Sequence, residues 1–382
     1  MDASHNHSPP TLDGDKVLLI DSLPAFTQDV IIARPASPQA QAFRWLANDT
    51  SVPTYPRWRI QQRYALITLY YATADSGTQR VEGGFFLDST LHECEWLTTR
   101  DPCIGIFQAD NQTGVFRHLH LESHQLAGTI PEEIALFTSL QTLNLGQNLL
   151  TGPLPTTLGL LTLLETLQLH RNRLTSTLPS ELGALMSLKE LHLAGNLFSG
   201  PIPWQLGNLG SLQQVLLEDA LLSGGIPAEL GSIPSLFLLW LGRNLLTSWI
   251  PSELGNATSL IELSLYDNLL SSTIPTEIGK LENVDALWLH SNQLTSSIPQ
   301  EMARLARFAL NRVSIVNTSI TGEIPADFCG LARMEFTCTA LLCGCNCGCT
   351  VNEGDFVDAH NQSMRDDVEK AINLNQNSPP GQ

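Results

Sequence analysis

Large apolar residues recur with a fixed period along residues 116–328. The shared frame is L-x-x-L-x-L-x-x-N-x-L-x-G-x-I-P-x-x-L-G-x-L-x-x. It begins at nine positions: Phe116, Leu140, Leu164, Leu188, Leu212, Leu236, Leu260, Val284 and Leu310. The first seven steps are 24 residues long and the last is 26. A period of this length predicts a solenoid, in which each coil contacts only its neighbours.

Within each coil, the L-x-L segment is typical of a short β-strand. Alternate side chains of a strand point to opposite faces, so Leu119 and Leu121 of the first coil are expected to point inward. Parallel strands lie about 4.8 Å apart, so nine of them would span roughly 40 Å. The two extra residues of the last step fall near Ala303 to Phe308 and are expected to bulge on the convex side.

Asparagine and proline columns mark the turns of each coil. The asparagine amides are expected to pair backbone groups that a curved coil leaves unpaired, and proline fixes φ where the chain turns onto the convex face. The columns are Asn148, Asn172, Asn196, Asn244, Asn268 and Asn292, and Pro131, Pro155, Pro179, Pro203, Pro227, Pro251, Pro275, Pro299 and Pro325. Ala220 interrupts the asparagine column, which predicts a locally looser repeat.

The segment before the repeats divides into two parts. Residues 1–35 are polar and proline-containing, and we expect them to be poorly ordered. Residues 36–115 are expected to form a helical, disulfide-containing cap, because the first coil of a solenoid otherwise exposes an apolar edge. Ser37 and Pro38 predict a helix start, and recurring apolar positions predict a second helix from about Trp58 to Ala72.

The eight cysteines lie in two groups, one on each side of the repeats. They are Cys94 and Cys103, then Cys329, Cys338, Cys343, Cys345, Cys347 and Cys349. An even number confined to two caps favours disulfides, among them Cys94–Cys103, and an oxidising compartment. Residues 329–349 are thus expected to form a cysteine-rich C-terminal cap, followed by an acidic polar tail over residues 350–382. The C-x-C-x-C-x-C run leaves a thiolate metal site open, but zinc prefers C-x₂₋₄-C spacings, which favours disulfides.

Sequons also fit a secretory environment. N-x-S/T motifs without proline begin at Asn6, Asn48, Asn111, Asn256, Asn317 and Asn361. The N-terminus has no basic segment followed by an apolar one, and no stretch of about 18 apolar residues predicts a membrane span. Either the chain is cytosolic or its export signal is missing from this sequence. The cysteines favour the second alternative, so we expect an extracellular or cell-surface location.

The charge balance narrows the class of partner. The formal net charge is −18, and 15% of the residues are charged. This argues against nucleic acid and against anionic membranes, both of which attract basic surfaces. The sequence contains no G-x-S-x-G, no H-E-x-x-H and no glycine-rich phosphate loop, so we expect no enzyme and no cofactor.

The repeats resemble a known family. The runs LNLGQNLLTGPLPTTLG and LHLAGNLFSGPIPWQLGNL are similar to the plant-type leucine-rich repeats of receptor-like kinases, receptor-like proteins and polygalacturonase-inhibiting proteins. Cys94-Glu-Trp96 with Cys103 resembles the N-terminal cap of that family, and the longer stretch RYALITLYYATADSG…HECEW is similar to caps of leucine-rich-repeat proteins from diatoms. The resemblance implies an α/β solenoid, a right-handed superhelix with a parallel β-sheet on its concave face. It also implies extracellular or membrane-associated recognition, without naming a ligand.

Aromatic side chains gather on three consecutive coils of the expected concave face, which solenoids commonly use for binding. Exposed aromatic residues beside charged ones are typical of binding hot spots. The candidate ligand-binding residues are Trp240, Arg243, Tyr266, Asp267, Trp288 and His290. Alternatively, the rings stack along the ladder and only stabilise the sheet.

Other polar residues on this face show no clear chemistry in the sequence. His118, His120, His170 and His192 lack metal-ligand spacing and are interpreted as surface residues, so we expect no metal among the repeats. The carboxylates Glu218, Asp219 and Glu262 lie on the same face without a defined pairing.

Three functions follow from these observations. The first is a non-enzymatic recognition module that binds a protein or peptide ligand, with a co-receptor or secreted enzyme as a possible further partner. The second is an inhibitor of a secreted hydrolase, whose basic surface would meet the acidic repeat protein. The third is an intracellular scaffold, which free thiols and unmodified sequons would favour.

Overall fold

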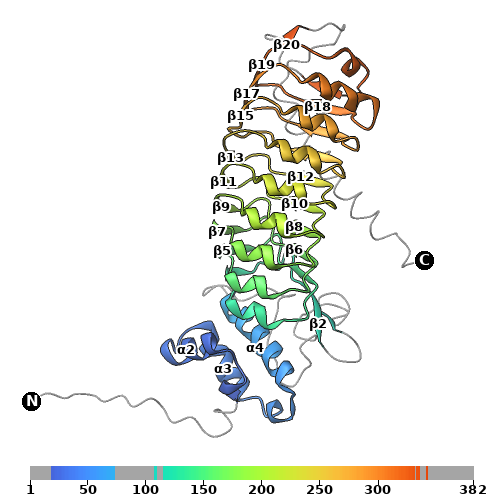
Figure 1. Ribbon diagram of the computed structural model, residues 1–382. Helices are drawn as coiled ribbons and strands as arrows, with labels where there is room; N and C mark the ends of the chain where they lie inside the picture. The colour runs from blue at the N-terminus through green and yellow to red at the C-terminus, as the bar shows by residue number, and fades with distance from the viewer. Residues whose placement is uncertain (1–18, 74–106, 110–114, 332, 336–340, 343–382) are drawn as a thin grey trace, which may run out of the picture.

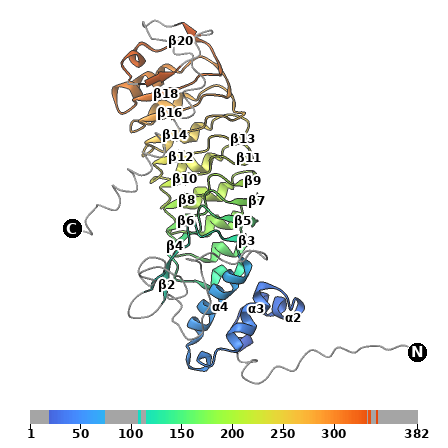
Figure 2. The ribbon, with the colours of Figure 1, turned by 180° about the vertical axis from the view of Figure 1, so that it is seen from behind.

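The computed structural model describes residues 19–73, 107–109, 115–331, 333–335 and 341–342. From residue 116 onward the described chain winds into an elongated solenoid, with helices packed against its first coil (Figure 1). Each coil passes through a strand of one sheet, a strand on the opposite edge and a short 3₁₀ segment between them. Figures 1 and 2 show the strands of the larger sheet and the second set of strands on opposite edges of the solenoid.

The larger sheet has 11 strands in the order β1-β2-β4-β6-β8-β10-β12-β14-β16-β18-β21. Its strands are β1 (Phe107–Ala109), β2 (Phe116–His120), β4 (Thr142–Asn144), β6 (Thr166–Gln168), β8 (Glu190–His192), β10 (Gln214–Leu216), β12 (Leu238–Trp240), β14 (Glu262–Ser264), β16 (Ala286–Trp288), β18 (Arg312–Ser314) and β21 (Arg333–Glu335). All neighbours pair in parallel except β1 and β2, which are antiparallel. Pairing advances by one repeat, so Leu216 lies beside Trp240 and Trp240 beside Ser264. The predicted parallel sheet is confirmed, and its solvent side is called the concave face below.

A second set of strands runs along the opposite edge. It comprises β3 (Ala127–Thr129), β5 (Leu149–Gly152), β7 (Arg173–Thr177), β9 (Leu197–Gly200), β11 (Leu221–Gly224) and β13 (Leu245–Leu246) in one sheet; β15 (Ser271–Ser272), β17 (Gln293–Ser296) and β19 (Ser319–Ile320) in another; and β20 (Gly322–Glu323) with β22 (Leu341–Leu342). These strands are not among the predicted elements. They are short and rich in serine, threonine and glycine, so they lack the apolar alternation that marks a strand.

The convex segments are 3₁₀ helices. They are η3 (Glu132–Leu136), η4 (Thr156–Leu160), η5 (Ser180–Ala184), η6 (Trp204–Asn208), η7 (Ala228–Ser232), η8 (Ser252–Asn256), η9 (Thr276–Lys280), η10 (Gln300–Arg307) and η11 (Ala326–Gly330). Each follows a residue of the proline column, such as Pro131 before η3, whose fixed φ starts the turn. The 26-residue step lengthens η10 to 8 residues and leaves Phe308 exposed, which confirms the predicted bulge.

The asparagine column supplies hydrogen bonds inside the solenoid. Asn148 is typical: its Nδ2 donates to the carbonyl of Leu121 in the previous coil at 2.7 Å and to that of Leu145 at 2.9 Å. Its Oδ1 accepts from the backbone N–H of Leu126 at 3.0 Å. The pattern recurs from Asn172 to Asn292. The asparagines therefore pair backbone groups at the turns, as predicted.

Three α-helices precede the solenoid: α2 (Ala25–Ala33), α3 (Pro38–Ala47) and α4 (Arg57–Ala72), with the short η1 (Val52–Thr54) between the last two. Ser37 caps α3 by accepting from the N–H of Ala40 at 3.1 Å, as expected from the Ser-Pro start. Helix α4 packs on the first coil, where the N–H of Phe116 donates to Gln62 at 2.9 Å.

Helix α2 corrects the expectation for residues 1–35, because Ala25–Ala33 within that segment is helical. Its Thr27 hydroxyl donates to Glu133 of η3 at 3.0 Å, and Gln39 of α3 donates to the other carboxylate oxygen at 3.1 Å. Contacts with α3 and the first coil stabilise a segment whose composition alone predicted little order. None of the helices in the described ranges has both the length and the apolar character needed to cross a bilayer.

Candidate functional site

The aromatic residues singled out in the sequence lie together on the concave face, but they are buried. Trp240, Tyr266 and Trp288 are 4%, 5% and 2% exposed. They form one cluster, called the aromatic cluster here, with Leu216, Leu238 and Ala286, and Phe237 packs against it. The expectation of exposed rings is therefore wrong. Rings on neighbouring coils are one strand spacing apart, so they cover one another and their aliphatic neighbours.

Trp288 is held by polar and charged neighbours from the adjacent strands. Its Nε1 donates to Glu262 Oε1 at 2.6 Å. The guanidinium carbon of Arg312 lies 5.9 Å from the centre of the ring, within cation–π range. His290 meets the ring edge-on, with ring centres 6.4 Å apart. Trp288 therefore has a defined orientation, which suits both a packing role and a preorganised binding surface.

Tyr266 lies flat over the previous coil. A Cβ added to Gly242 would meet its Cε1 at 2.3 Å, so only glycine admits the ring at this place. On the other side, Tyr266 stacks on His290, with centres 4.9 Å apart. Burial, and after it the charge of Glu218, raises the pKa of the Tyr266 phenol, while burial lowers the pKa of His290 to about 4. Both side chains are therefore neutral at neutral pH.

Glu218 is the unusual charge of this face. It is 8% exposed, and its Oε1 has no hydrogen-bond partner among the residues that the structure describes. Burial, followed by the nearby carboxylates of Glu262 and Asp219, raises the pKa of Glu218 well above its usual value, and Arg243 opposes this. Arg243 itself lies 3.1 Å from Asp219.

Near Glu218, three side-chain atoms on strands β12, β14 and β18 are also buried without a hydrogen-bond partner within the described ranges. They are Trp240 Nε1, Ser264 Oγ and Ser314 Oγ. Trp240, Ser264 and Ser314 occupy the same outward position in strands β12, β14 and β18. Asp267, the remaining predicted residue, is exposed at the edge, where its N–H donates to the carbonyl of His290 at 3.0 Å. The structure thus brings the predicted residues together and adds Glu218, Ser264 and Ser314.

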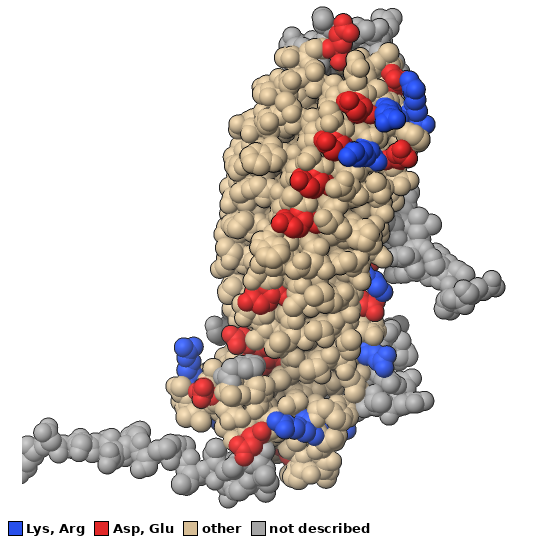
Figure 3. Space-filling model, viewed as in Figure 1, with Lys and Arg blue, Asp and Glu red and all other residues tan. Residues whose placement is uncertain are grey.

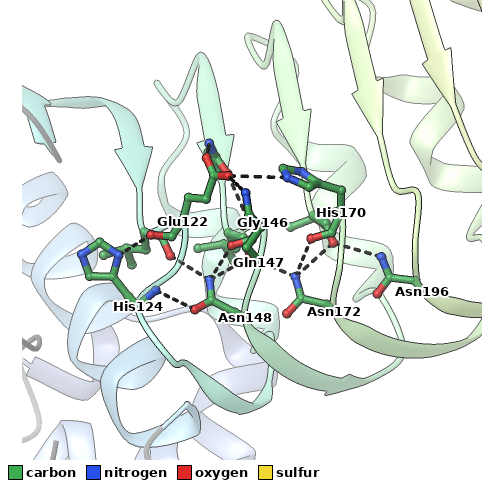
Figure 4. A network of polar contacts seen from close by, with 12 residues as sticks. Glu122, His124, Gly146, Gln147, Asn148, His170, Asn172 and Asn196 are labelled. Atoms are coloured by element: carbon green, nitrogen blue, oxygen red, sulfur yellow. Dashed lines mark hydrogen bonds and ion pairs between the residues drawn. The ribbon is translucent and has the colours of Figure 1, made fainter. Parts of the chain in front are cut away.

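A related network lies nearer the N-terminal end of the same face (Figure 4). Glu122 accepts from Asn144 Nδ2 at 2.9 Å and from Gln147, and its Oε1 lies 3.5 Å from His170 Nε2. The His170 ring lies over Gly146, where an added Cβ would meet it at 2.4 Å. From their spacing in the sequence, these histidines were expected to be separate surface residues. One pattern in the sequence could have predicted this network. Glu122, Gly146 and His170 occupy the same frame position in three successive coils.

The histidines of this network are partly buried, and burial keeps them neutral. His170 and His192 stack with ring centres 4.1 Å apart. Burial lowers the pKa of His192 to about 3, with His170 adding to the effect. In the part of the chain that the structure describes, no group of three or more His, Cys, Asp or Glu side chains is arranged to hold a metal ion.

Only some of the predicted glycosylation and disulfide sites lie within the described residues. Asn48, Asn256 and Asn317 are exposed, whereas Asn111 lies outside the described residues. Cys94, Cys103, Cys338 and the run from Cys343 to Cys349 also lie outside them. Cys329 falls in η11 without a described side chain. The predicted disulfides remain predictions.

The face that carries the 3₁₀ helices is sparsely charged (Figure 3). Acidic residues follow one another along it, because five of these helices carry one glutamate in the first turn. These are Glu181, Glu229, Glu253, Glu277 and Glu301. These five glutamates form a row on the convex side and contribute to the negative net charge.

Comparisons with known proteins agree with this architecture. The Leucine Rich Repeat family model matches residues 139–161, 163–185, 187–209 and 259–281. The structure of the plant peptide hormone receptor RGFR1 in complex with RGF2 is 30% identical with a TM-score of 0.52, covering 57% of this chain and 40% of that chain. The ectodomain of GASSHO1/SCHENGEN3 from Arabidopsis thaliana, in complex with CASPARIAN STRIP INTEGRITY FACTOR 2, is 32% identical with a TM-score of 0.64, covering 73% and 32%. No curated protein sequence matches.

A third similar structure is the Arabidopsis receptor kinase HAESA in complex with the peptide hormone IDA and the co-receptor SERK1. It is 26% identical with a TM-score of 0.57, and the match covers 76% of this chain and 50% of that chain. The chain therefore spans half or less of the length of these receptor structures. The matched segments are leucine-rich repeats, and the repeats form a leucine-rich-repeat solenoid similar to these plant receptor structures.

Proposed function

We propose that this chain is a non-enzymatic recognition module that binds a peptide or protein ligand on the concave face over β10–β18. The observation that carries this proposal is the set of buried polar atoms without described partners beside the aromatic cluster: Glu218 Oε1, Trp240 Nε1, Ser264 Oγ and Ser314 Oγ. Native proteins leave few buried polar groups unpaired, because each costs free energy. A ligand with complementary donors and acceptors would satisfy them.

The similar structures support a peptide as the class of ligand. Those of RGFR1, GASSHO1/SCHENGEN3 and HAESA are each complexes with a named partner, described as a peptide hormone for HAESA. The HAESA complex also contains a co-receptor, so a second protein partner is part of the proposal.

The serines offer a test that separates binding from folding. In the free protein, a buried hydroxyl without a partner contributes little stability, so replacing Ser264 and Ser314 by alanine should leave melting unchanged or raised. The ligand for this test is selected first, as the peptide that the wild-type protein retains best from a library of short random peptides. The affinity of the double variant for that peptide should be about tenfold lower, because the ligand loses two hydrogen bonds. The control is Ser252→Ala on the convex η8, where the side chain is exposed. Unchanged affinity in the double variant would contradict the proposed site.

The inhibitor reading has one observation in its favour, the row of glutamates on the convex 3₁₀ helices (Figure 3). A basic enzyme surface would be attracted to this row, and the attraction would weaken with salt. Reversing Glu229, Glu253 and Glu277 to lysine should then abolish inhibition of a basic secreted polygalacturonase while peptide binding on the concave face persists. Equal inhibition by the triple variant would exclude this role for the row.

We also propose that the protein works outside the cell or at its surface. The exposure of Asn48, Asn256 and Asn317 supports this, because each sequon is accessible to a glycosylating enzyme. Protein made in a secretory host should lose mass on glycosidase treatment, and its eight cysteines should resist alkylation before reduction. Unmodified asparagines and alkylated cysteines in protein from its natural source would favour the intracellular scaffold instead.

A further inference from the structure

We propose that Glu218, with Trp240 and Tyr266, forms a subsite for a cationic side chain, the guanidinium or ammonium group of an arginine or lysine in the ligand. This inference rests on the proposed peptide-binding function and adds the chemistry that selects the ligand. Two stretches of the concave face, four coils apart, have residues at the same frame positions and differ in the partners of one glutamate.

The first stretch is the network around Glu122, and the second is its counterpart around Glu218. The matching residues are Glu122 and Glu218, Asn144 and Trp240, Gly146 and Gly242, Gln147 and Arg243, and His170 and Tyr266. In both, a ring from the third coil lies over the glycine of the second, since an added Cβ would meet that ring at 2.4 Å over Gly146 and at 2.3 Å over Gly242. The two stretches therefore share one backbone arrangement.

The stretches differ in what reaches the carboxylate. Glu122 is satisfied within the protein by Asn144, Gln147 and His170 (Figure 4). At the second stretch, Trp240 and Tyr266 replace two of these donors with aromatic rings. Arg243 replaces the third, and its Nε lies 3.1 Å from Asp219. Glu218 Oε1 is consequently buried without a partner among the described residues, although the frame position is the same.

The surroundings of Glu218 select a positive charge. Glu262 and Asp219 add negative charge nearby, and Arg243 is the nearby cation, set against Asp219. The charge of Glu218 acts on Tyr266, where it helps to raise the pKa of the phenol. Trp240 and Tyr266 both belong to the aromatic cluster. Aromatic faces attract ammonium and guanidinium groups, most strongly where water is excluded. A carboxylate near this aromatic cluster therefore complements a cation and repels an anion.

Burial explains why the subsite favours a charged ligand over water. A buried carboxylate without a partner is costly, so it takes up a proton and its pKa rises. A cationic side chain would replace that proton and form a charge-assisted hydrogen bond. The formal net charge of −18 would add long-range attraction for a basic peptide.

The test uses butylguanidinium chloride as the probe, followed by tryptophan fluorescence against sodium chloride at equal ionic strength. We expect a saturable change in the wild-type protein and about tenfold weaker binding in Glu218→Gln, which keeps the size of the side chain. Glu282→Gln, at an exposed glutamate outside both proposed binding surfaces, should bind like the wild type. The absence of a saturable change, or equal binding by Glu218→Gln, would overturn the inference.

A second measurement needs no variant and so does not depend on folding of a mutant. Butylurea has the shape of butylguanidinium without its charge, and it should bind the wild-type protein at least about tenfold more weakly. Equal binding of the two would overturn the cationic subsite. In the peptide library, retained sequences that show no preference for arginine or lysine would also overturn it, while leaving the proposed function intact. Binding of butylguanidinium with no retained peptide would reject the proposed function and leave the cation site.

Discussion

At the residue scale, single side chains take the place of backbone partners at each turn. Each asparagine of the column links two coils through hydrogen bonds to carbonyls and from an N–H, as Asn244 does with Leu217, Leu241 and Leu222. These bonds recur with the repeat, so a single departure can be compared with its neighbours. Ala220 is that departure.

Restoring the column should stabilise the solenoid. In Ala220→Asn, the new amide would donate to the carbonyls of Leu193 and Leu217 and accept from the N–H of Phe198, by analogy with Asn196. We expect the free energy of unfolding in urea to rise by about 1 kcal/mol, with slower hydrogen exchange at Phe198. Ala220→Ser, which is too short to span these groups, is the control. Unchanged exchange at Phe198 in the asparagine variant would show that this turn is already satisfied.

Buried histidines should make the fold sensitive to acid. The native pKa of His192 is lowered to about 3 from 6.5, so between these values the unfolded chain binds more protons than the folded one. The contribution of His192 to the stability of the fold is therefore fully present above about pH 6.5, and it is lost as the pH falls toward 3. His192→Gln should lose less unfolding free energy between about pH 7 and pH 4 than the wild type. His124→Gln, outside the stack with His170, serves as control, and parallel pH profiles for His192→Gln and wild type would refute the assignment.

At the element scale, each of the 3₁₀ helices η4 to η9 packs on the next helix through a glycine. A Cβ at Gly231 would lie 2.0 Å from the backbone oxygen of Glu253 in the next helix, whereas one at Gly210 would meet nothing within 4 Å. Backbone cannot retreat as a flexible side chain does, so the first position excludes any larger residue.

This pair gives a matched prediction. Gly231→Ala should lower the free energy of unfolding by about 1–3 kcal/mol, because η7 and η8 must separate. Gly210→Ala should change it by less than about 0.5 kcal/mol. Chemical denaturation of both variants provides the measurement. Similar losses in the two would mean that the cost comes from the backbone conformation of glycine rather than from the close approach of the helices.

The sequence predicted those elements whose pattern is apolar and periodic. The nine strands β2 to β18 of the larger sheet, the asparagine and proline columns and the helix capped by Ser37 follow from spacing and side-chain chemistry alone. Strands β1 and β21 lie outside the repeat frame and were not predicted. The second set of strands did not, because residues such as Ser271 and Ser272 in β15 form a strand only through pairing with the next coil. The grouping of Trp240, Tyr266 and Trp288 was also predictable, but their burial depends on how neighbouring side chains pack.

At the scale of the whole molecule, the repeats form one continuous core that leaves two different surfaces. One is the sparsely charged convex face with its row of glutamates, and the other is the concave face with the aromatic cluster and its buried polar atoms. A solenoid can vary its outward residues without disturbing the leucines inside. We therefore propose the outward residues of β10 to β18 as the ligand-binding site.

Photo-cross-linking of peptides retained from the library would show whether a ligand binds on the concave face. Each peptide would carry a photoreactive group, and mass spectrometry would locate the attachment sites on the wild-type protein. We expect attachment to outward residues between Gln214 and Val316, and less of it in Glu218→Gln when the peptide contains arginine or lysine. Attachment to the 3₁₀ helices or to the second set of strands, with none on the concave face, would contradict this expectation.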